Sequence, residues 1–251
     1  MIDVLICGIG GKMGGNVLSL LEGDTQARAV CGVDVYAPAH CSVPVYSSFD
    51  DVAESPAVVI DFSSPKVLPD LLSFAKRKKC ALVLATTGYT KDDLAAIEKA
   101  SGEIPVFRTA NFSVGVNLLV RLVKEAAAFL GEAFDAEIVE THHRLKADAP
   151  SGTALMLAES VNDAFDEKKE YVEGRSGIVG KRGREIGIHA VRGGTVVGVH
   201  DVHFLGEDEE IVLSHRATSK KVFASGAIRA AKFVAGMPAG KYDMNDVLKN
   251  V

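Results

Sequence analysis

The residues with the greatest chemical potential lie in one short segment of the chain, Glu140–Thr153. Four of its residues carry or can gain a positive charge: His142, His143, Arg144 and Lys146. So many cations in one place favour a substrate with two carboxylates, and imidazole and ammonium groups can also donate protons. The segment therefore predicts a site for acid–base chemistry on a small dianion, with a solvated basic loop as the alternative.

The same segment runs into a predicted helix over 151–165. Ser151 is a favoured N-cap residue, and the free N–H groups at the start of a helix attract anions. Gly152 has no side chain and would let a substrate carboxylate come close to these N–H groups. We therefore predict that Ser151 and Gly152 bind substrate, and we interpret Arg144 as exposed and Asp148 as a brace for the loop.

A zinc site at His142 and His143 is not favoured. Neighbouring residues of a strand point to opposite faces, and neither an H-E-x-x-H motif nor a pair of cysteine ligands accompanies them. We expect no metal site in this protein.

A glycine-rich turn, Gly8–Gly14, follows the first predicted strand and opens the first predicted helix. Glycines in this place let the backbone approach a pyrophosphate at the helix start. The turn fits G-x-x-G-x-x-G better than G-x-G-x-x-G, because Met13 stands at the last glycine of the second pattern. Asp34 ends the second predicted strand 20 residues after Gly14, where a carboxylate can bind ribose hydroxyls. The turn predicts a dinucleotide site, with a purely structural turn as the alternative.

The residues around Asp34 also bear on the choice of cofactor. A carboxylate repels a 2′-phosphate, and Val35 stands where an arginine could have bound one. Lys12 could partly neutralise such a phosphate. We predict that NADH is used at least as well as NADPH.

Two further tetrads follow predicted strands, Ala85–Gly88 and Thr109–Phe112. Ligands of open α/β sheets bind beyond the carboxyl ends of the strands. We therefore expect both tetrads near the nicotinamide, with ordinary loop structure as the alternative.

These candidate residues require elements that bring them together, and the first hundred residues alternate strand and helix. The predicted strands are short and rich in Val, Ile and Leu: Asp3–Cys7, Ala29–Asp34, Ala57–Phe62, Ala81–Ala85 and Ile104–Phe107. The predicted helices between them are Lys12–Glu22, Pro65–Lys79 and Thr90–Ala100. Such strands show no alternation of apolar and polar residues, and their alternation with helices indicates a doubly wound, Rossmann-type parallel sheet.

The pattern changes after residue 112. Predicted helices over 113–130 and 151–165 flank a strand at Asp135–His142. Three long strands follow and suggest a meander: Glu185–Arg192, Thr195–Leu205 and Glu209–Thr218. A last helix at Ser219–Val234 returns to the first domain. We therefore predict an α/β fold, in which a dinucleotide-binding domain of residues 1–112 is completed by 220–251. A mixed α+β domain of residues 113–219 is inserted in it and carries the predicted substrate site.

Composition excludes several classes of protein. The chain has 251 residues, 47% of them hydrophobic, and a net charge of −5, which does not favour nucleic-acid binding. We see no signal peptide and no apolar run long enough to span a membrane, so we expect no membrane partner. The four cysteines are scattered and form no C-x-x-C pair, which favours a reducing cytoplasm. His189, His200, His203 and His215 are interpreted as structural. The role of the glycine-rich loop 174–187 stays open among an interface, a closing loop and a mobile segment.

The segment Glu140-x-His142-His143-x-x-Lys146-x-Asp148-Ala149-Pro150-Ser151-Gly152-Thr153 resembles the signature of the 4-hydroxy-tetrahydrodipicolinate reductase (dihydrodipicolinate reductase) family. The glycine turn, the Thr-Thr-Gly after the fourth strand and the segment Asn111–Asn117 match this family too. The resemblance covers essentially the whole chain. It departs at Ala85, where many relatives have glycine, and at Val35, where many have arginine.

The resemblance implies an enzyme of the diaminopimelate route to lysine, which reduces 4-hydroxy-tetrahydrodipicolinate, with loss of water, to tetrahydrodipicolinate. It implies that His142 is the acid–base residue, that Lys146 donates a proton, and that His143, Gly152 and Thr153 bind the substrate carboxylates. The implied nucleotide contacts are Gly8, Ile9, Gly10, Gly11, Lys12, Met13, Asp34, Ala85, Thr86, Thr87, Thr109, Ala110, Asn111 and Phe112. The family is commonly a homotetramer built through the sheet of the second domain, so the resemblance also implies that residues 113–219 serve oligomerisation.

Two other interpretations stay open. An amino-acid dehydrogenase of similar architecture is one, whereas a semialdehyde dehydrogenase that uses a thioester would need a cysteine after Cys80, and none follows. A non-catalytic NAD(P)-sensing protein is the other, but it would need no lysine beside paired histidines.

Overall fold

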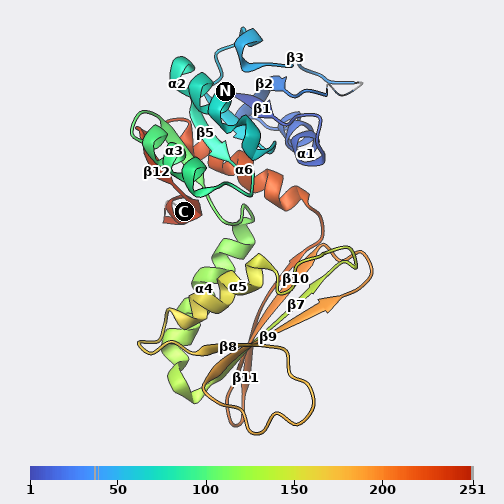
Figure 1. Ribbon diagram of the computed structural model, residues 1–251, viewed down its shortest axis with the longest axis vertical. Helices are drawn as coiled ribbons and strands as arrows, with labels where there is room; N and C mark the ends of the chain where they lie inside the picture. The colour runs from blue at the N-terminus through green and yellow to red at the C-terminus, as the bar shows by residue number, and fades with distance from the viewer. Residues whose placement is uncertain (37, 39, 250–251) are drawn as a thin grey trace. The chain divides into compact units, whose positions relative to one another are not determined.

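The computed structural model describes residues 1–36, 38 and 40–249, and the chain forms two compact units (Figure 1). Unit 1 consists of Met1–Ser113 and Lys221–Val251, and unit 2 of Val114–Lys220. The chain therefore leaves unit 1 once, builds unit 2, and returns.

Unit 1 is built on a seven-stranded sheet in the order β12-β6-β5-β4-β1-β2-β3, and every pair is parallel. Its strands are β1 (Ile2–Cys7), β2 (Ala27–Val33), β3 (Val45–Tyr46), β4 (Val58–Asp61), β5 (Ala81–Leu84), β6 (Pro105–Arg108) and β12 (Gly240–Tyr242). The central strands β4 and β5 are buried along their whole length, as predicted for short strands rich in Val, Ile and Leu. The predicted doubly wound parallel sheet is confirmed, with the very short strands β3 and β12 added at its two edges.

Helices cover both faces of this sheet (Figure 1). They are α1 (Lys12–Leu21), α2 (Leu68–Lys78), α3 (Lys91–Ser101), α6 (Lys221–Val234) and α7 (Met244–Lys249), with short 3-10 turns at Phe49–Asp51 and Pro65–Val67. On one face, α6 contacts α1 and the strands β4, β5 and β6. On the other, Leu68, Leu71 and Phe74 of α2 pack in the core. Helix α3 begins at a capping box formed by Thr90 and Asp93.

Unit 2 has a five-stranded sheet in the order β11-β10-β7-β9-β8. Its strands are β7 (Asp135–His142), β8 (Glu170–Glu173), β9 (Glu185–Arg192), β10 (Gly198–Leu205) and β11 (Glu210–Ala217). The predicted meander of β9, β10 and β11 is wrong in one step. Strand β9 pairs in parallel with β7, and β7 lies between β9 and β10. The connection over residues 193–197 is long enough to bridge the roughly 10 Å between next-but-one strands, so neighbours in the chain need not pair.

One face of the unit 2 sheet is buried under α4 (Val114–Leu130) and α5 (Gly152–Asn162). Strand β7 shows this in its alternation, because Ala136 and Ile138 are buried and Glu137 between them is only partly buried. The next two positions on the same buried face are Glu140 and His142. On this face of β7, two apolar residues of the core are therefore followed by two polar residues, which are also buried.

The loop before β9 is tied to the opposite face of the sheet. Arg175 and Arg182 both form ion pairs with Glu137, and Arg182 also pairs with Asp135 and donates to the backbone carbonyls of Ala136 and Glu185. His189 lies 2.7 Å from Glu137. The arginines of this segment thus have acidic partners within unit 2.

Among the described residues, no helix is both long enough and apolar enough to span a membrane.

Candidate functional site

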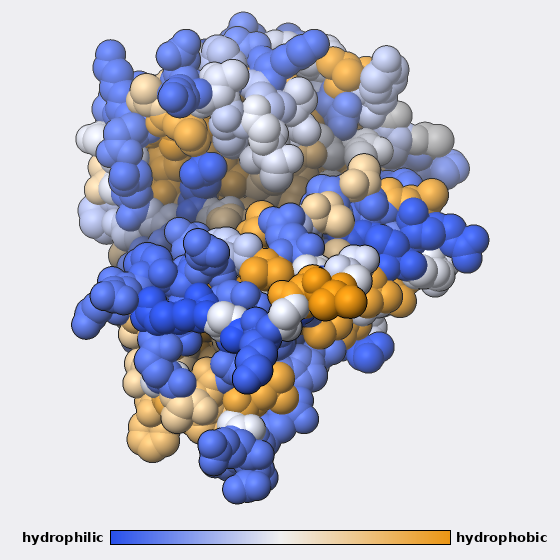
Figure 2. All heavy atoms as spheres, turned by 60° about the horizontal axis from the view of Figure 1, so that its bottom comes forward, coloured by the Kyte–Doolittle hydropathy of each residue, from blue (hydrophilic) through white to orange (hydrophobic). Residues whose placement is uncertain are grey.

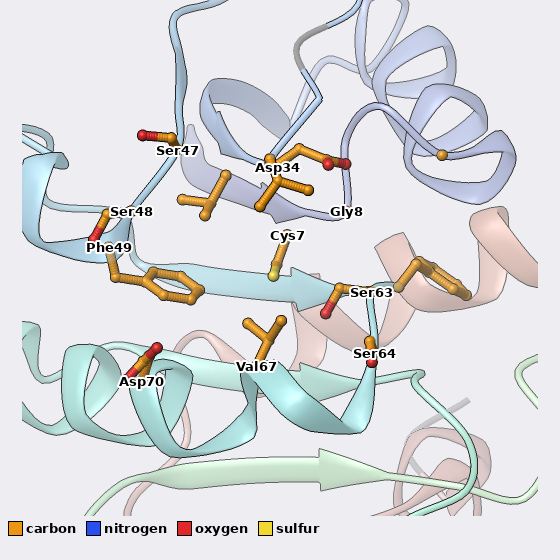
Figure 3. A pocket seen from close by; sticks show the side chains of 14 residues that line it. Cys7, Gly8, Asp34, Ser47, Ser48, Phe49, Ser63, Ser64, Val67 and Asp70 are labelled. Atoms are coloured by element: carbon orange, nitrogen blue, oxygen red, sulfur yellow. The ribbon is translucent and has the colours of Figure 1, made fainter.

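A cavity of about 440 Å³ lies at the carboxyl ends of β1, β2 and β4 in unit 1 (Figure 3). Figure 3 shows the segment Ser47–Phe49 at one end of the cavity and Ser63 with Ser64 at the other. The lining residues are Cys7, Gly8, Gly11, Val33, Asp34, Val35, Ser47, Ser48, Phe49, Phe62, Ser63, Ser64, Val67 and Asp70. Strand β1 lies between β4 and β2 in the sheet, so the cavity opens at the position where doubly wound folds bind their ligands.

The glycine turn is shaped by three glycines that no other residue could replace without strain. Gly8 has φ +80°, and a Cβ there would lie 2.7 Å from the Phe62 carbonyl oxygen. A Cβ on Gly10 would collide with the Tyr36 carbonyl oxygen, and one on Gly14 with the Gly8 carbonyl oxygen. Gly14 therefore serves the close packing of α1 on the turn, whereas Gly8 and Gly10 keep the backbone of the turn free of side chains.

Asp34 is held against this turn. Its carboxylate accepts hydrogen bonds from the backbone N–H groups of Gly10, at 2.9 Å, and Tyr36, at 3.0 Å. Helix α1 begins after Gly11, which makes no side-chain cap, and its first turn contains no acidic residue. The helix start is thus open to an anion, and the exposed Lys12 is its first residue.

The remaining predicted residues of the turn differ in what they can offer. The Ile9 side chain is buried and lies against the Cα of Gly32, so it could reach a nucleotide only through its backbone. Met13 is half-buried, with its sulfur 3.9 Å from the Asn16 amide nitrogen.

The two other predicted nucleotide segments lie at the same edge of the sheet, after β5 and β6. Ala85, Thr86 and Thr87 follow β5, and the Ala85 N–H donates to the Asp61 carbonyl. Thr109, Ala110, Asn111 and Phe112 follow β6. The Asn111 side-chain oxygen accepts from the Ser113 N–H, and the Phe112 ring is buried against Phe62 and Phe107. None of these residues lines the cavity beside Asp34.

Several cavity residues escaped the sequence reasoning, above all Ser47, Ser48, Ser63 and Ser64. Ser63 and Ser64 could have been found, because they follow β4 just as the predicted tetrads follow β5 and β6. Ser47 and Ser48 follow the two-residue strand β3, which has no recognisable pattern.

The centre of the candidate site in unit 2 is a fully buried carboxylate, Glu140. Its Oε2 accepts from His142 Nδ1 at 2.6 Å and from Arg192 Nη1 at 2.7 Å. Its Oε1 accepts from the Ser151 N–H at 2.9 Å and from Arg192 Nη2 at 2.7 Å. Burial by itself raises the pKa of the Glu140 carboxyl, but the hydrogen bonds from Arg192, His142 and Ser151 outweigh it and hold that pKa below its usual value. Glu140 is therefore ionised near neutral pH.

An ionised carboxylate only accepts hydrogen bonds, which determines the tautomer of His142. The ring carries a proton on Nδ1, directed at Glu140, and its Nε2 lies next to the Cα of Gly198. The opposite nitrogen is thus the one available for chemistry, as in other carboxylate–histidine pairs.

Sheet register explains why these groups meet. Arg192 of β9 lies directly opposite His142 of β7, and His200 of β10 lies directly opposite Glu140. Residues opposite each other share a face. All four side chains therefore lie on the face that α5 covers.

His200 lies between the His142 ring and the start of α5. Its Nε2 lies 3.0 Å from the Ser151 hydroxyl, and its ring packs edge-on to the His142 ring with 5.1 Å between centroids. Burial lowers the pKa of His200 to about 4, so this ring is neutral near pH 7.

Helix α5 begins as predicted. Ser151 is its N-cap, and the Ser151 hydroxyl accepts from the Ala154 N–H at 3.2 Å. Gly152 is exposed, and a Cβ there would meet nothing within 4 Å, so no packing within the protein requires glycine at this position. Thr153 follows in the first turn, and His143 is half-buried just after β7.

The four predicted cations do not act as one cluster. Lys146 Nζ contacts both carboxylate oxygens of Asp148, at 2.9 and 2.8 Å, and His142 has Glu140 as its own counter-charge. Arg144 is exposed. Asp148 braces the loop, as predicted, through Lys146 and through its carbonyl, which accepts from Arg192.

Glu140, Arg192 and His200 are the members of this site that sequence reasoning did not assign. Glu140 was inside the recognised motif, but Arg192 and His200 lie 50 or more residues further along the chain. Only the pairing of β7 with β9 and β10 brings them together.

In the described ranges 1–36, 38 and 40–249, no three His, Cys, Asp or Glu side chains converge in a way that could hold a metal ion.

The parallel sheet, the open start of α1 and the carboxylate at the end of β2 are the arrangement of a dinucleotide-binding oxidoreductase domain. Residues 2–112 match the family model for the N-terminus of dihydrodipicolinate reductase, and residues 115–248 match the one for its C-terminus. The chain belongs to the dihydrodipicolinate reductase family, which confirms the resemblance.

Individual relatives agree over nearly their whole length. The chain is 49% identical to a 4-hydroxy-tetrahydrodipicolinate reductase of Caldanaerobacter subterraneus, with 99% of each chain covered. It is 42% identical to the enzyme of the same name from Clostridium tetani, covering 100% of this chain and 98% of that one. A dipicolinate-bound dihydrodipicolinate reductase from Paenisporosarcina sp. TG-14 has a TM-score of 0.82 and 25% identity, with 98% and 99% of the two chains covered.

Proposed function

We propose that this protein reduces 4-hydroxy-tetrahydrodipicolinate, with loss of water, to tetrahydrodipicolinate, using NADH or NADPH, in the diaminopimelate route to lysine. Family membership and the names of relatives over their full length support this activity. The observation that carries it in the structure is the His142–Glu140 pair beside the start of α5. Membership of this family argues against the two alternatives, an amino-acid dehydrogenase and a non-catalytic NAD(P) sensor.

Unit 1 provides a fit for the dinucleotide. The backbone of the glycine turn and the uncapped start of α1 would hold the pyrophosphate, and Asp34 would bind the adenosine ribose in the cavity of about 440 Å³. Ala85, Thr86 and Thr87 with Thr109, Ala110, Asn111 and Phe112 would hold the nicotinamide half. The bound nicotinamide supplies the hydride.

Unit 2 would bind and protonate the substrate. One substrate carboxylate would lie at the start of α5, against the N–H groups of Gly152 and Thr153, with His143 nearby. Lys146 would deliver a proton to the carbon next to the one that receives hydride. His142 would present Nε2 to the substrate, with the buried Glu140 stabilising positive charge on the ring.

The lining of the cavity supports the proposal that NADH is a good cofactor. Its lining contains two carboxylates, Asp34 and Asp70, and neither lysine nor arginine. A 2′-phosphate near Asp34 would be repelled, and we expect Lys12 to neutralise it only in part. We propose that NADH serves at least as well as NADPH.

We also propose that the protein is a homo-oligomer, with a tetramer as the expected form. Figure 2 shows apolar side chains exposed in patches among hydrophilic ones. Val191, Leu205 and Val212 are exposed on the sheet face opposite α4 and α5. A second copy covering this face would bury them. Light scattering of the wild type and of Val212→Glu tests this, since a monomeric wild type would contradict it.

The proposed compartment is the cytoplasm. All four cysteines are free thiols, and Cys7, Cys31 and Cys80 are buried. This usage fits a reducing environment.

The activity is tested by following NADH absorbance while dihydrodipicolinate synthase generates the substrate in the same cuvette. We expect NADH oxidation that depends on the synthase and on its substrates. Oxidation that is absent with NADH and with NADPH, in a protein that binds either nucleotide, would contradict the proposed function.

A further inference from the structure

We infer that Arg192 is a positioning residue for this reaction, which sets the His142 ring and the Lys146 loop in place together. The inference rests on the roles proposed above for His142 and Lys146. It concerns a residue of β9 that lies outside the sequence motif and contacts neither a predicted substrate group nor a nucleotide group.

The guanidinium of Arg192 makes two kinds of contact. It grips the Glu140 carboxylate with both of its terminal nitrogens, each at 2.7 Å. Its Nη2 also donates to the Asp148 carbonyl at 2.8 Å, and its Nη1 to the Val191 carbonyl at the same distance. Such a planar fork holds direction as well as distance, which a lysine ammonium cannot do.

Through Glu140, this grip reaches the His142 ring. Glu140 is fully buried, and without the guanidinium its charge would lose its main compensation. The carboxylate would then take up a proton more easily or turn, and either change would weaken the bond that keeps the proton on His142 Nδ1. The result would be a mixture of ring tautomers, only one of which presents Nε2 as a base or hydrogen-bond acceptor.

Of the groups around His142, Arg192 is the one that can balance the negative charge of Glu140. On β7 itself, the facing group is Glu140, and on β10 it is His200, whose pKa near 4 keeps it neutral at pH 7. His215 of β11 lies beyond His200, and burial lowers its pKa too. Arg192 of β9 is therefore the permanent charge that balances Glu140.

Through Asp148, the same guanidinium reaches Lys146. The Asp148 carbonyl binds Arg192, and the Asp148 carboxylate binds Lys146 Nζ. The Lys146 N–H also donates to the His143 carbonyl at 3.1 Å, which closes the turn. One side chain thus connects the strand that carries the imidazole with the loop that carries the ammonium group.

The test compares Arg192→Lys and Arg192→Gln with the wild-type enzyme. Arg182→Lys is the matched control, because Arg182 forms ion pairs with Asp135 and Glu137 of β7 on the opposite face. We expect kcat to fall about 10- to 100-fold in Arg192→Lys, the usual range for loss of an outer-shell partner. The KM for NADH should change little, and Arg182→Lys should keep a kcat within about twofold of wild type, as for residues remote from the chemistry.

Two readouts separate positioning from simple stabilisation. Nitrogen NMR of histidine-labelled protein should show His142 protonated on Nδ1 in the wild type and as a tautomer mixture in Arg192→Lys. Added guanidinium should restore part of the kcat of Arg192→Gly. If Arg192→Gln does not accumulate as folded protein, the inference is tested by the kcat and the NMR spectrum of Arg192→Lys.

Three results would overturn the inference: a wild-type kcat in Arg192→Lys, equal losses of kcat in Arg192→Lys and Arg182→Lys, or a loss of kcat with the His142 tautomer unchanged. The NMR spectrum needs no turnover. A protein with the expected tautomers but without reductase activity would therefore contradict the proposed function and leave the Arg192–Glu140–His142 linkage standing.

Discussion

A methyl group built on Gly198 would lie 3.0 Å from Nε2 of His142. The edge of the ring that we expect to face substrate is thus kept clear by the absence of a side chain on the neighbouring strand. Contacts this short force a neighbour to move by a few tenths of an ångström.

We predict that Gly198→Ala lowers kcat about tenfold, because small misplacements of a reacting group are costly, and leaves the KM for NADH nearly unchanged. Gly206→Ala is the matched control, since its methyl would lie equally close, 3.0 Å, to the Phe134 ring instead. Steady-state kinetics of both variants decide the matter. Equal losses in the two would show a general effect on unit 2 rather than crowding of His142.

The two proposed proton-handling residues can be tested directly. His142→Ala and Lys146→Ala should each lower kcat by about 10²–10⁴-fold, the scale of lost acid–base assistance. Lys124→Ala removes an exposed lysine that pairs with Asp163 and should keep wild-type kinetics. A kcat near wild type in either test variant would remove that residue from the mechanism.

Cofactor preference should respond to one residue beside Asp34. Val35 is 76% exposed and lines the cavity, so Val35→Arg would place a cation where a 2′-phosphate would lie. We expect the ratio of kcat/KM for NADPH over NADH to rise about tenfold, as for one new charge-assisted contact. Val35→Gln supplies length without charge and should leave the ratio nearly unchanged. A wild-type enzyme that strongly favours NADPH would contradict the underlying assignment.

Glu137 should control stability in acid. Burial by itself raises its pKa, but hydrogen bonds from Arg175, His189 and Arg182 outweigh burial and lower the pKa from 4.5 to about 2. A lowered pKa stabilises the fold above pH 4.5, and this contribution disappears as the pH falls toward 2. We expect the free energy of unfolding to fall over this window and to fall less steeply in Glu137→Gln. Urea titrations between pH 5 and pH 3 measure both slopes, and parallel slopes would disprove the link.

Two adjacent glycines of α1 should respond oppositely to alanine. A methyl on Gly14 would collide with the Gly8 carbonyl, and we expect Gly14→Ala to cost about 1–3 kcal/mol of stability and to weaken NADH binding. A methyl on Gly15 meets nothing within 4 Å, and there alanine should add up to about 1 kcal/mol through helix propensity. Thermal melts and NADH titrations distinguish the two, and a stable Gly14→Ala would contradict the packing described for the turn.

The parts that sequence predicted best are those with a local cause. The short strands rich in Val, Ile and Leu, the glycine turn and the Ser151 cap each depend on neighbouring residues, and the structure has all of them. The prediction of a meander was wrong because it assumed that strands adjacent in the chain also pair in the sheet. In the structure, β7 lies between β9 and β10.

The candidate site was predictable only in its contiguous part. The segment from Glu140 to Thr153 is recognisable by itself, but Arg192 and His200 join it through strand register. Register depends on which faces are buried and how turns close, and a single sequence does not show either for strands so far apart. The ion pair of Lys146 with Asp148, by contrast, lies within one loop and could have been anticipated.

Strand β7 carries ionic groups on both faces, Glu137 toward Arg175 and Arg182, and Glu140 toward Arg192. A slip of one residue would exchange the faces, burying Glu137 under the helices and turning His142 outward. Either misplaced carboxylate would lose its arginine. The two ionic clusters therefore fix the register of β7 against its neighbouring strands, and only one register pairs both carboxylates with arginine.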